Sequence, residues 1–212
     1  MTDFSGLSLE EFLSRLASQA PTPGGGTAAA AAGAMGAALA EMVAALTLAR
    51  EKYADSHEAM RSIAGAAGAA RTQFLSLAAE DAAAYDGVVA ARRLPKDTEP
   101  QKAERAARLQ AANRRATEVP LATARLAAGL LARLPELSQK GNPNAASDAG
   151  SAALLLEAAA RGALLNVRIN LPGVTDAAGA AEMAGEAASI EREVKQICSA
   201  VFASIGERIS SS

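Results

Sequence analysis

Apolar residues recur at helical spacing along almost the whole chain, and short segments rich in proline, glycine and asparagine interrupt the pattern. The clearest case is the last segment, where apolar residues from Ile190 to Ile205 return every three or four positions. No segment shows the strict alternation of apolar and polar residues that is typical of strands in hairpins. The pattern therefore predicts an all-helical protein.

Turn signals divide the chain into six expected helices. Ser8 and Glu11 have the spacing of a capping box, which predicts a short first helix. That helix should end before residues 21–26 (PTPGGG), where two prolines disfavour helix and three glycines permit backbone angles closed to other residues. The other helices are expected at about residues 27–50, 55–94, 100–134, 147–170 and 176–209.

Several residues inside these segments carry more specific expectations. Pro120 lies within the fourth helix and should kink it or break it in two. Ser147 or Asp148 is expected to cap the fifth helix. Small residues should let helix axes approach closely, and the glycines concerned are Gly33, Gly36, Gly65 and Gly68. We expect an all-α, up-and-down bundle of long helices that forms one domain over residues 1–212.

The alanine content also predicts association. Half of the residues are hydrophobic, but alanine supplies much of that fraction and aromatic residues make up only 3%. Alanine-rich helices bury less apolar area per residue than leucine-rich helices do. Burying further surface between two copies would stabilise such a bundle, so we expect a homodimer.

Charge and cysteine content narrow the classes of partner and compartment. A formal net charge of −2 argues against nucleic acid, which requires a basic excess. The single Cys198 excludes an internal disulfide, and we expect it to lie in the core. The N-terminus does not resemble a signal peptide. We therefore expect a cytoplasmic location. Residues 27–49 are long enough to span a bilayer, but alanine and glycine dominate them and no membrane span is expected.

Four polar clusters are candidates for chemistry. The Gly24–Gly26 turn precedes a helix but lacks both common nucleotide fingerprints, so it is either a tight loop or a substrate-binding loop. Asp81 and Tyr85 share one helix face, where solvation is the ordinary explanation. Amides and a carboxylate gather in a turn at Asn142, Asn144, Ser147 and Asp148, and two more amides lie one helical turn apart at Asn166 and Asn170.

A locally basic region and the missing metal-ligand motifs complete the survey. Residues 92–115 carry eight arginine or lysine side chains, which form either a solvated helix face or a site for an anionic ligand tail. His57 is the only histidine, and no pair of histidines or Glu-x-x-His step is present. A site for a metal held by protein side chains is therefore not expected.

Taken in order, these segments resemble the cyclodeaminase/cyclohydrolase family of folate one-carbon metabolism. The resemblance rests on the 21–26 loop, the Asp81 to Tyr85 step, Leu94-Pro95-Lys96, Val119-Pro120-Leu121, residues 141–148 and residues 166–170. It covers nearly the whole chain. The family is all-helical and dimeric, with the folate cleft at or near the subunit interface.

The resemblance implies an activity and a set of site residues. It implies either hydrolysis of 5,10-methenyl-tetrahydrofolate to 10-formyl-tetrahydrofolate, the preferred reading, or release of ammonia from 5-formimidoyl-tetrahydrofolate with a separate formimidoyltransferase as partner. A non-catalytic folate-binding bundle is the third interpretation. Asp148 is the first candidate acid/base and Asp81 the second. The implied substrate-binding residues are Gly24, Gly25, Gly26, Lys96, Asn142, Asn144, Asn166 and Asn170. No metal or tightly bound cofactor is implied.

Overall fold

A computed structural model describes residues 6–210 of the chain, and all of its regular secondary structure is helical. The α-helices are α1 (Leu9–Leu16), α2 (Gly25–Leu48), α3 (His57–Arg92), α4 (Glu99–Leu131), α5 (Leu134–Lys140), α6 (Ala146–Asn170) and α7 (Ala177–Ser210). Short 3-10 helices connect some of them, namely η1 (Glu51–Ser56), η2 (Pro143–Ala145) and η3 (Leu171–Gly173). No strand occurs between residues 6 and 210, which confirms the predicted all-α class.

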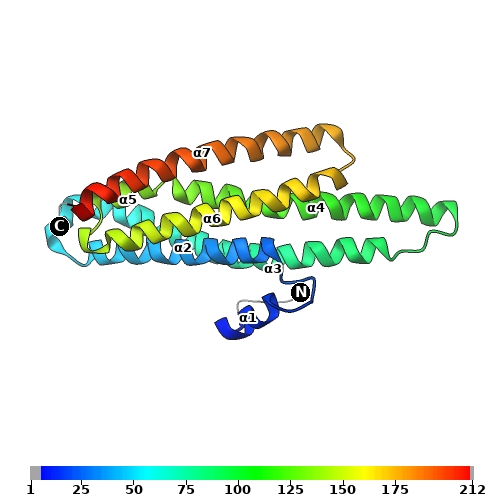
Figure 1. Cartoon of the computed structure of the whole chain (residues 1–212), viewed down its shortest axis with the longest axis horizontal. Helices are drawn as coiled ribbons and strands as arrows, with labels where there is room; N and C mark the ends of the chain where they lie inside the picture. Colours follow the sequence, from blue (N-terminus) through cyan, green and yellow to red (C-terminus); the bar gives the residue numbers. More distant parts are fainter. Residues whose placement is uncertain (1–5, 211–212) are drawn as a thin grey trace.

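The long helices lie nearly parallel and antiparallel in an elongated bundle (Figure 1). α2 packs against α3 on one side and α6 on the other, and α4 contacts both α3 and α6. α7 covers α6 and α4 from the outside. The α3 and α4 ends project beyond the other helices at one tip of the molecule (Figure 1).

Small residues form the seam at the centre of the bundle. Phe74 of α3 lies directly over Gly33, and a Cβ atom added to that glycine would come within 2.7 Å of the ring. Gly36 approaches α6 in the same way, because a Cβ atom added to it would lie 2.9 Å from Leu156 Cγ. Gly65 meets nothing within 4 Å. The close approach predicted for glycine is therefore confirmed at Gly33 and Gly36, and Gly65 has no such role.

α2 is the one helix in the described residues that is long and apolar enough to cross a membrane. It lies between α3 and α6, and half of its most apolar window is buried inside the bundle. Packing against two neighbouring helices therefore accounts for the buried half of this window.

Helix boundaries differ from the expectations at three places. α4 continues through Pro120 and is not broken there. It ends at Leu131 instead, and the separate short helix α5 follows. Neither Ser147 nor Asp148 caps α6, whose N-cap is Ala145 without a side-chain hydrogen bond. The Asn142 side chain caps the preceding 3-10 turn and accepts a hydrogen bond from the Asn144 N–H.

α1 stands apart from the bundle. The predicted capping box is present, with Ser8 and Glu11 hydrogen-bonded to each other's backbone N–H groups. None of the α1 residues is buried, and in Figure 1 the helix projects below α2. It leads through residues 17–24 into the start of α2.

Candidate active site

A cavity of about 470 Å³ lies where the 21–26 loop meets α3, α4 and the end of α6. The loop contributes Pro21, Thr22 and the three glycines, and α3 contributes Asp81, Tyr85, Val88 and Arg92. The opposite wall consists of Asn113 and Ala116 from α4 and Asn166, Ile169 and Asn170 from α6. The cavity therefore brings together three of the four polar clusters and the first arginine of the basic region.

Asp81 lies against the N-terminal turn of α2. The Thr27 hydroxyl donates a hydrogen bond of 2.9 Å to Asp81 Oδ2. A Cβ atom at Gly26 would come within 2.6 Å of the Asp81 carboxyl carbon, so glycine is required there by the close approach. The first N–H groups of a helix lack partners inside the helix, and α2 has no side-chain cap of its own. The Asp81 carboxylate supplies a negative charge at this helix end.

The reason for glycine in the loop differs from the expectation. No glycine among residues 6–210 has a positive φ, so the loop does not use angles closed to other residues. Glycine at position 26 provides space for a carboxylate.

The electrostatic balance at Asp81 favours a stronger base than an ordinary carboxylate. Burial raises the pKa of Asp81, and hydrogen bonds from the Thr27 hydroxyl and backbone only partly offset this effect. The hydrogen bonds from Thr27 thus stabilise the ionised carboxylate of Asp81, and the loss of solvent around it destabilises the same form. Such a group gains or loses a proton closer to neutral pH than a solvated aspartate does.

Three asparagine amides line the opposite wall. Asn170 donates to the Ala116 carbonyl at 2.7 Å, and Asn166 donates to the Gly162 carbonyl at 2.9 Å. Asn113 donates to the Gly173 carbonyl at 2.9 Å. Each amide has a second N–H and a carbonyl oxygen without a described protein partner. These groups are able to bind a planar polar ligand.

Asn113 was not anticipated from the sequence. It lies in the middle of α4, where a single asparagine is indistinguishable from a solvated surface residue. Its only distinguishing signal is its spacing from Ala116 and Thr117, which puts it on the side of α4 that faces α6.

The remaining predicted residues lie elsewhere. Asn142 and Asn144 are in the η2 turn, where the Asn142 amide oxygen accepts bonds from Tyr53 and from the Asn144 backbone. Asp148 is in the first turn of α6. It is 18 residues from Asn166 along the same helix, so the two are separated by about 27 Å at 1.5 Å per residue. Within one chain this turn does not line the cavity.

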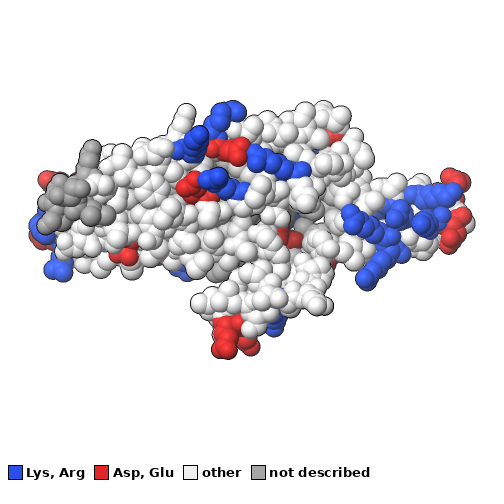
Figure 2. Space-filling view, viewed as in Figure 1, with Lys and Arg blue, Asp and Glu red and all other residues white. Residues whose placement is uncertain are grey.

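Lys96 lies in the loop between α3 and α4, beyond the mouth of the cavity. Figure 2 shows lysine and arginine atoms concentrated around this tip. Several basic residues of the region pair with acids, including Arg115 with Glu80 and Lys102 with Glu99. Among the described residues, Lys96, Arg92 and Arg93 have no acidic side chain within 4.0 Å, the limit for an ion pair. They form a positive surface next to the cavity.

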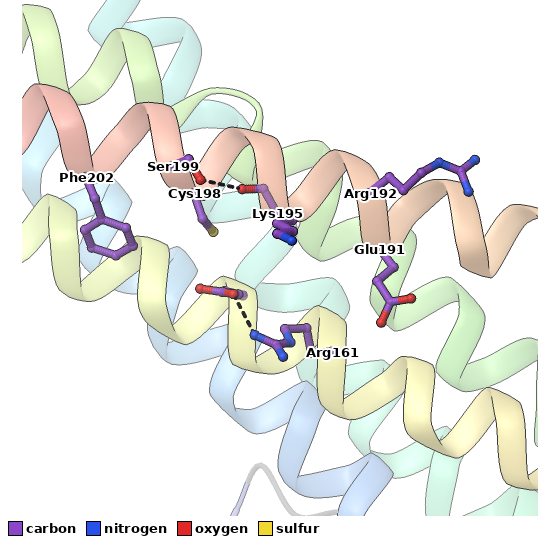
Figure 3. Close-up of a pocket in the computed structure, with 8 residues that line it drawn as sticks. Arg161, Glu191, Arg192, Lys195, Cys198, Ser199 and Phe202 are labelled. Atoms are coloured by element: carbon purple, nitrogen blue, oxygen red, sulfur yellow. Dashed lines mark hydrogen bonds and ion pairs between the residues drawn. The ribbon is translucent and has the colours of Figure 1, made fainter.

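A second hollow, of about 880 Å³, lies between α6 and α7 (Figure 3). Its charged residues include Arg161, which is paired with Glu157, and Glu191, which is paired with Arg168. Cys198 lines it, but burial raises the pKa of this thiol to about 12, so it is a protonated core residue as expected. Its glutamates are ion-paired with arginines and no asparagine amide among the described residues lines it, so this hollow is the weaker candidate.

The described residues contain no group of three or more His, Cys, Asp or Glu side chains placed to hold a metal ion. His57 lies near the start of α3, where its Nε2 is 3.3 Å from the Arg50 carbonyl oxygen, and it does not line the cavity.

Comparison with known proteins gives consistent matches over this fold. The chain is 39% identical over 202 residues to a methenyltetrahydrofolate cyclohydrolase of Methylorubrum extorquens, covering 95% of this chain and 97% of that protein. It is 41% identical to the formimidoyltransferase-cyclodeaminase of Sus scrofa over 88% of this chain, but it spans only 35% of that longer protein. The crystal structure of a formiminotetrahydrofolate cyclodeaminase from Thermotoga maritima superposes with a TM-score of 0.87 at 33% identity, covering 97% of this chain and 98% of that one.

The family profile described as formiminotransferase-cyclodeaminase matches residues 8–189, a span that includes every residue of the cavity. The family expected from the sequence motifs is therefore confirmed, and the chain belongs to the formiminotransferase-cyclodeaminase family.

Proposed function

We propose that this protein is a 5,10-methenyl-tetrahydrofolate cyclohydrolase, which hydrolyses its substrate to 10-formyl-tetrahydrofolate. The observation that carries the proposal is the cavity itself, in which the half-buried Asp81 carboxylate faces three asparagine amides with unused hydrogen-bonding groups. The near-complete match to a free-standing cyclohydrolase supports this choice between the family's activities.

In this proposal Asp81 is the acid/base. The methenyl carbon of the substrate is bound to both reactive folate nitrogens and shares their positive charge. The carboxylate stabilises that charge and accepts a proton from the attacking water, whose oxygen then bonds to the carbon. When the adduct opens, the bond to one ring nitrogen breaks, and that nitrogen keeps the electron pair and takes a proton. The adduct's hydroxyl proton is released, and a formyl group remains on the other nitrogen.

The amides and the basic tip bind the two ends of the substrate. The pterin edge presents alternating donors and acceptors, which suit the amides of Asn113, Asn166 and Asn170. Arg92 at the mouth, with Lys96 beyond it, supplies positive charge for the carboxylates of the glutamate tail. The substrate would thus extend from the Asp81 carboxylate towards the α3–α4 tip.

A second candidate activity is 5-formimidoyl-tetrahydrofolate cyclodeaminase. It is favoured by the structural match to the Thermotoga maritima cyclodeaminase, which covers 98% of that chain. In that reaction a folate nitrogen attacks the formimidoyl carbon and ammonia leaves, so the protonated form of Asp81 would supply the proton to the leaving amine. The raised pKa of Asp81 serves this role equally well.

We also propose a cytoplasmic homodimer. In a two-fold dimer with antiparallel α6 helices, the turn containing Asn142, Asn144 and Asp148 of one copy approaches the cavity of the other. This arrangement would reconcile the two separated clusters of predicted site residues. Asp148 then remains a candidate for the same reaction across the interface.

An absorbance assay with purified protein separates the candidate functions. Loss of the methenyl chromophore from 5,10-methenyl-tetrahydrofolate, above the uncatalysed rate, identifies a cyclohydrolase. Gain of the chromophore with release of ammonia from 5-formimidoyl-tetrahydrofolate identifies a cyclodeaminase. No reaction with either substrate, together with folate binding, would leave the binding-protein interpretation and refute the proposal.

A further inference from the structure

One side of α3 carries a row of residues that all line the cavity. They follow one another at steps of four, three and four positions, which keeps them on one side of a helix, and they are Asp81, Tyr85, Val88 and Arg92. Tyr85 lies about 6 Å along the helix axis from Asp81, and Arg92 lies about 16.5 Å from it, at 1.5 Å per residue. The row therefore presents a carboxylate, an aromatic ring, an aliphatic side chain and a cation in that order.

Tyr85 is the member of this row that combines an aromatic ring with exposure to the cavity. Among the described residues that line the cavity it is the only aromatic one, in a chain with four Phe, two Tyr and no Trp. It is 43% exposed. Within residues 6–210 its hydroxyl has no hydrogen-bond partner, whereas the Tyr53 hydroxyl donates to Asn142. The bundle thus does not use Tyr85 as a buried or hydrogen-bonded part of its core.

Apolar surface continues from Tyr85 across the cavity. Val88, about one turn further along α3, is buried and contributes to the same wall. Ile169 lies on the opposite wall near the end of α6 and is 77% exposed. Exposed apolar side chains on both walls of a polar cavity are suited to a flat apolar group that is covered from both sides.

The proposed substrate has such a group at a fixed place. In 5,10-methenyl-tetrahydrofolate the p-aminobenzoyl ring is bonded directly to one of the two nitrogens that hold the reactive carbon. The glutamate carboxylates follow at the far end of the molecule. With the reactive carbon at Asp81 and the carboxylates towards Arg92, the ring lies between them, beside Tyr85. The order of groups in the substrate therefore matches the order of side chains along α3.

We infer that Tyr85 binds the p-aminobenzoyl ring by stacking against it and thereby makes the site select folates over simple pterins. This inference rests on the proposed function and adds a residue for the part of the substrate between the reactive carbon and the glutamate. The contact uses the face of the tyrosine ring, so the hydroxyl is dispensable. Stacking of a flat ligand ring on an aromatic side chain is worth about tenfold in affinity or more.

The first test compares three ligands by calorimetry in oxygen-free buffer. 6-Methyl-tetrahydropterin has no benzoyl ring, 6-anilinomethyl-tetrahydropterin adds an uncharged ring, and tetrahydrofolate adds the carbonyl group and the glutamate. Tyr85→Ala should lower the affinity for the two ligands with the ring about tenfold and leave the affinity for 6-methyl-tetrahydropterin unchanged. Tyr85→Phe retains the stacking surface and should bind all three ligands as the natural protein does.

Two further variants are the controls. Leu75→Ala removes a 39% exposed apolar side chain from the same helix outside the cavity and should change no affinity. Arg92→Gln should weaken tetrahydrofolate alone, because only this ligand carries the glutamate carboxylates. Equal weakening of all three ligands by Tyr85→Ala, or the same loss in Tyr85→Phe, would overturn the stacking role.

The calorimetry also separates this inference from the proposed function. If the folded natural protein binds none of the three ligands, the folate activity and the role of Tyr85 both fail. If it binds tetrahydrofolate and Tyr85→Ala binds it equally well, only the role of Tyr85 fails.

The second test needs no variant of altered affinity. Tyrosine labelled with carbon-13 in the ring gives signals from Tyr53 and Tyr85 alone, and the spectrum of Tyr85→Phe assigns them. Binding of 6-anilinomethyl-tetrahydropterin should shift the Tyr85 signal through the ring current of the aniline, and 6-methyl-tetrahydropterin should shift it much less. An equal response to both ligands would show that the ring does not lie on Tyr85 and would overturn the proposal.

Discussion

The replacement Asp81→Asn tests the centre of the proposed mechanism, because it removes the charge and leaves the shape. The amide fits the same space beside Gly26, and one of its polar atoms can still bond the Thr27 hydroxyl. General acid–base catalysis by a positioned side chain contributes about 10²- to 10⁴-fold in rate. We therefore expect kcat to fall by about 10²-fold or more, with a much smaller change in KM.

Stability should move in the other direction. Burial raises the pKa of Asp81 in the folded protein above its unfolded value. Ionisation therefore costs the folded state stability at pH values above the folded pKa, and the cost disappears below the unfolded pKa. Each unit of difference corresponds to about 1.4 kcal/mol. Since asparagine does not ionise, the variant should be at least as stable as the natural protein at neutral pH and should lose this pH dependence.

The assay combines methenyl absorbance, thermal unfolding across pH and circular dichroism. Asp148→Asn is the comparison variant, because it changes the other predicted carboxylate about 27 Å away on the same chain. Turnover within threefold of normal for Asp81→Asn would refute the assignment of Asp81. A large loss in Asp148→Asn alone would transfer the acid/base role to that residue. Unfolding of Asp81→Asn at neutral pH would show that the carboxylate serves mainly as a helix cap.

Three further outcomes follow from the same contacts. Thr27→Val removes a hydrogen-bond donor from Asp81, so the pKa of the carboxyl should rise further. The acid limb of the pH–rate profile should then move to higher pH, and Thr27→Ser should restore the original profile. An unchanged profile would mean that the limb reports another group. Gly33→Ala should lower the free energy of unfolding by about 1–3 kcal/mol, because the added Cβ overlaps the Phe74 ring. Gly65→Ala should raise the free energy of unfolding by about 0.5–1 kcal/mol, because Gly65 meets no neighbour. Equal effects of the two variants in denaturant titrations would contradict the packing argument. Cys198, with a pKa of about 12, should resist iodoacetamide at pH values near 8 in the folded protein and react after unfolding, as mass spectrometry can follow.

Local rules predicted most of the fold because the elements are long and their signals agree. The capping box at Ser8 and the helix stop at Leu171 are formed as expected. Pro120 did not break α4, since its neighbours hold the surrounding turns in a buried position. The cap expected at Ser147 or Asp148 failed because the preceding Asn142 already organises the turn.

The sequence predicted which types of residue form the candidate site, but not which of the predicted residues lie together. Asp81, Asn166 and the glycine loop meet in one cavity, whereas Asn142, Asn144 and Asp148 do not line it. Helix periodicity says which side of a helix a residue occupies, but it does not give the relative shift of two helices along their axes. The shift between α4 and α6 is what brings Asn113 to the cavity, and it kept Asn113 from being recognised. The separation of Asp148 from Asn166, in contrast, follows from their positions 18 residues apart on one helix.

The small residues at the centre of the bundle change how this protein can vary over time. A core built from leucine is damaged chiefly by side chains that become smaller, whereas the seam at Gly33 and Gly36 has almost nothing to remove. Alanine loses no side-chain entropy on folding, so ordering each alanine costs little free energy. The close packing around these positions, however, leaves no space for a larger side chain. Sequence drift along α2 should therefore be bounded by a maximum side-chain volume, and substitutions that enlarge a residue there should be compensated by a smaller partner on α3 or α6.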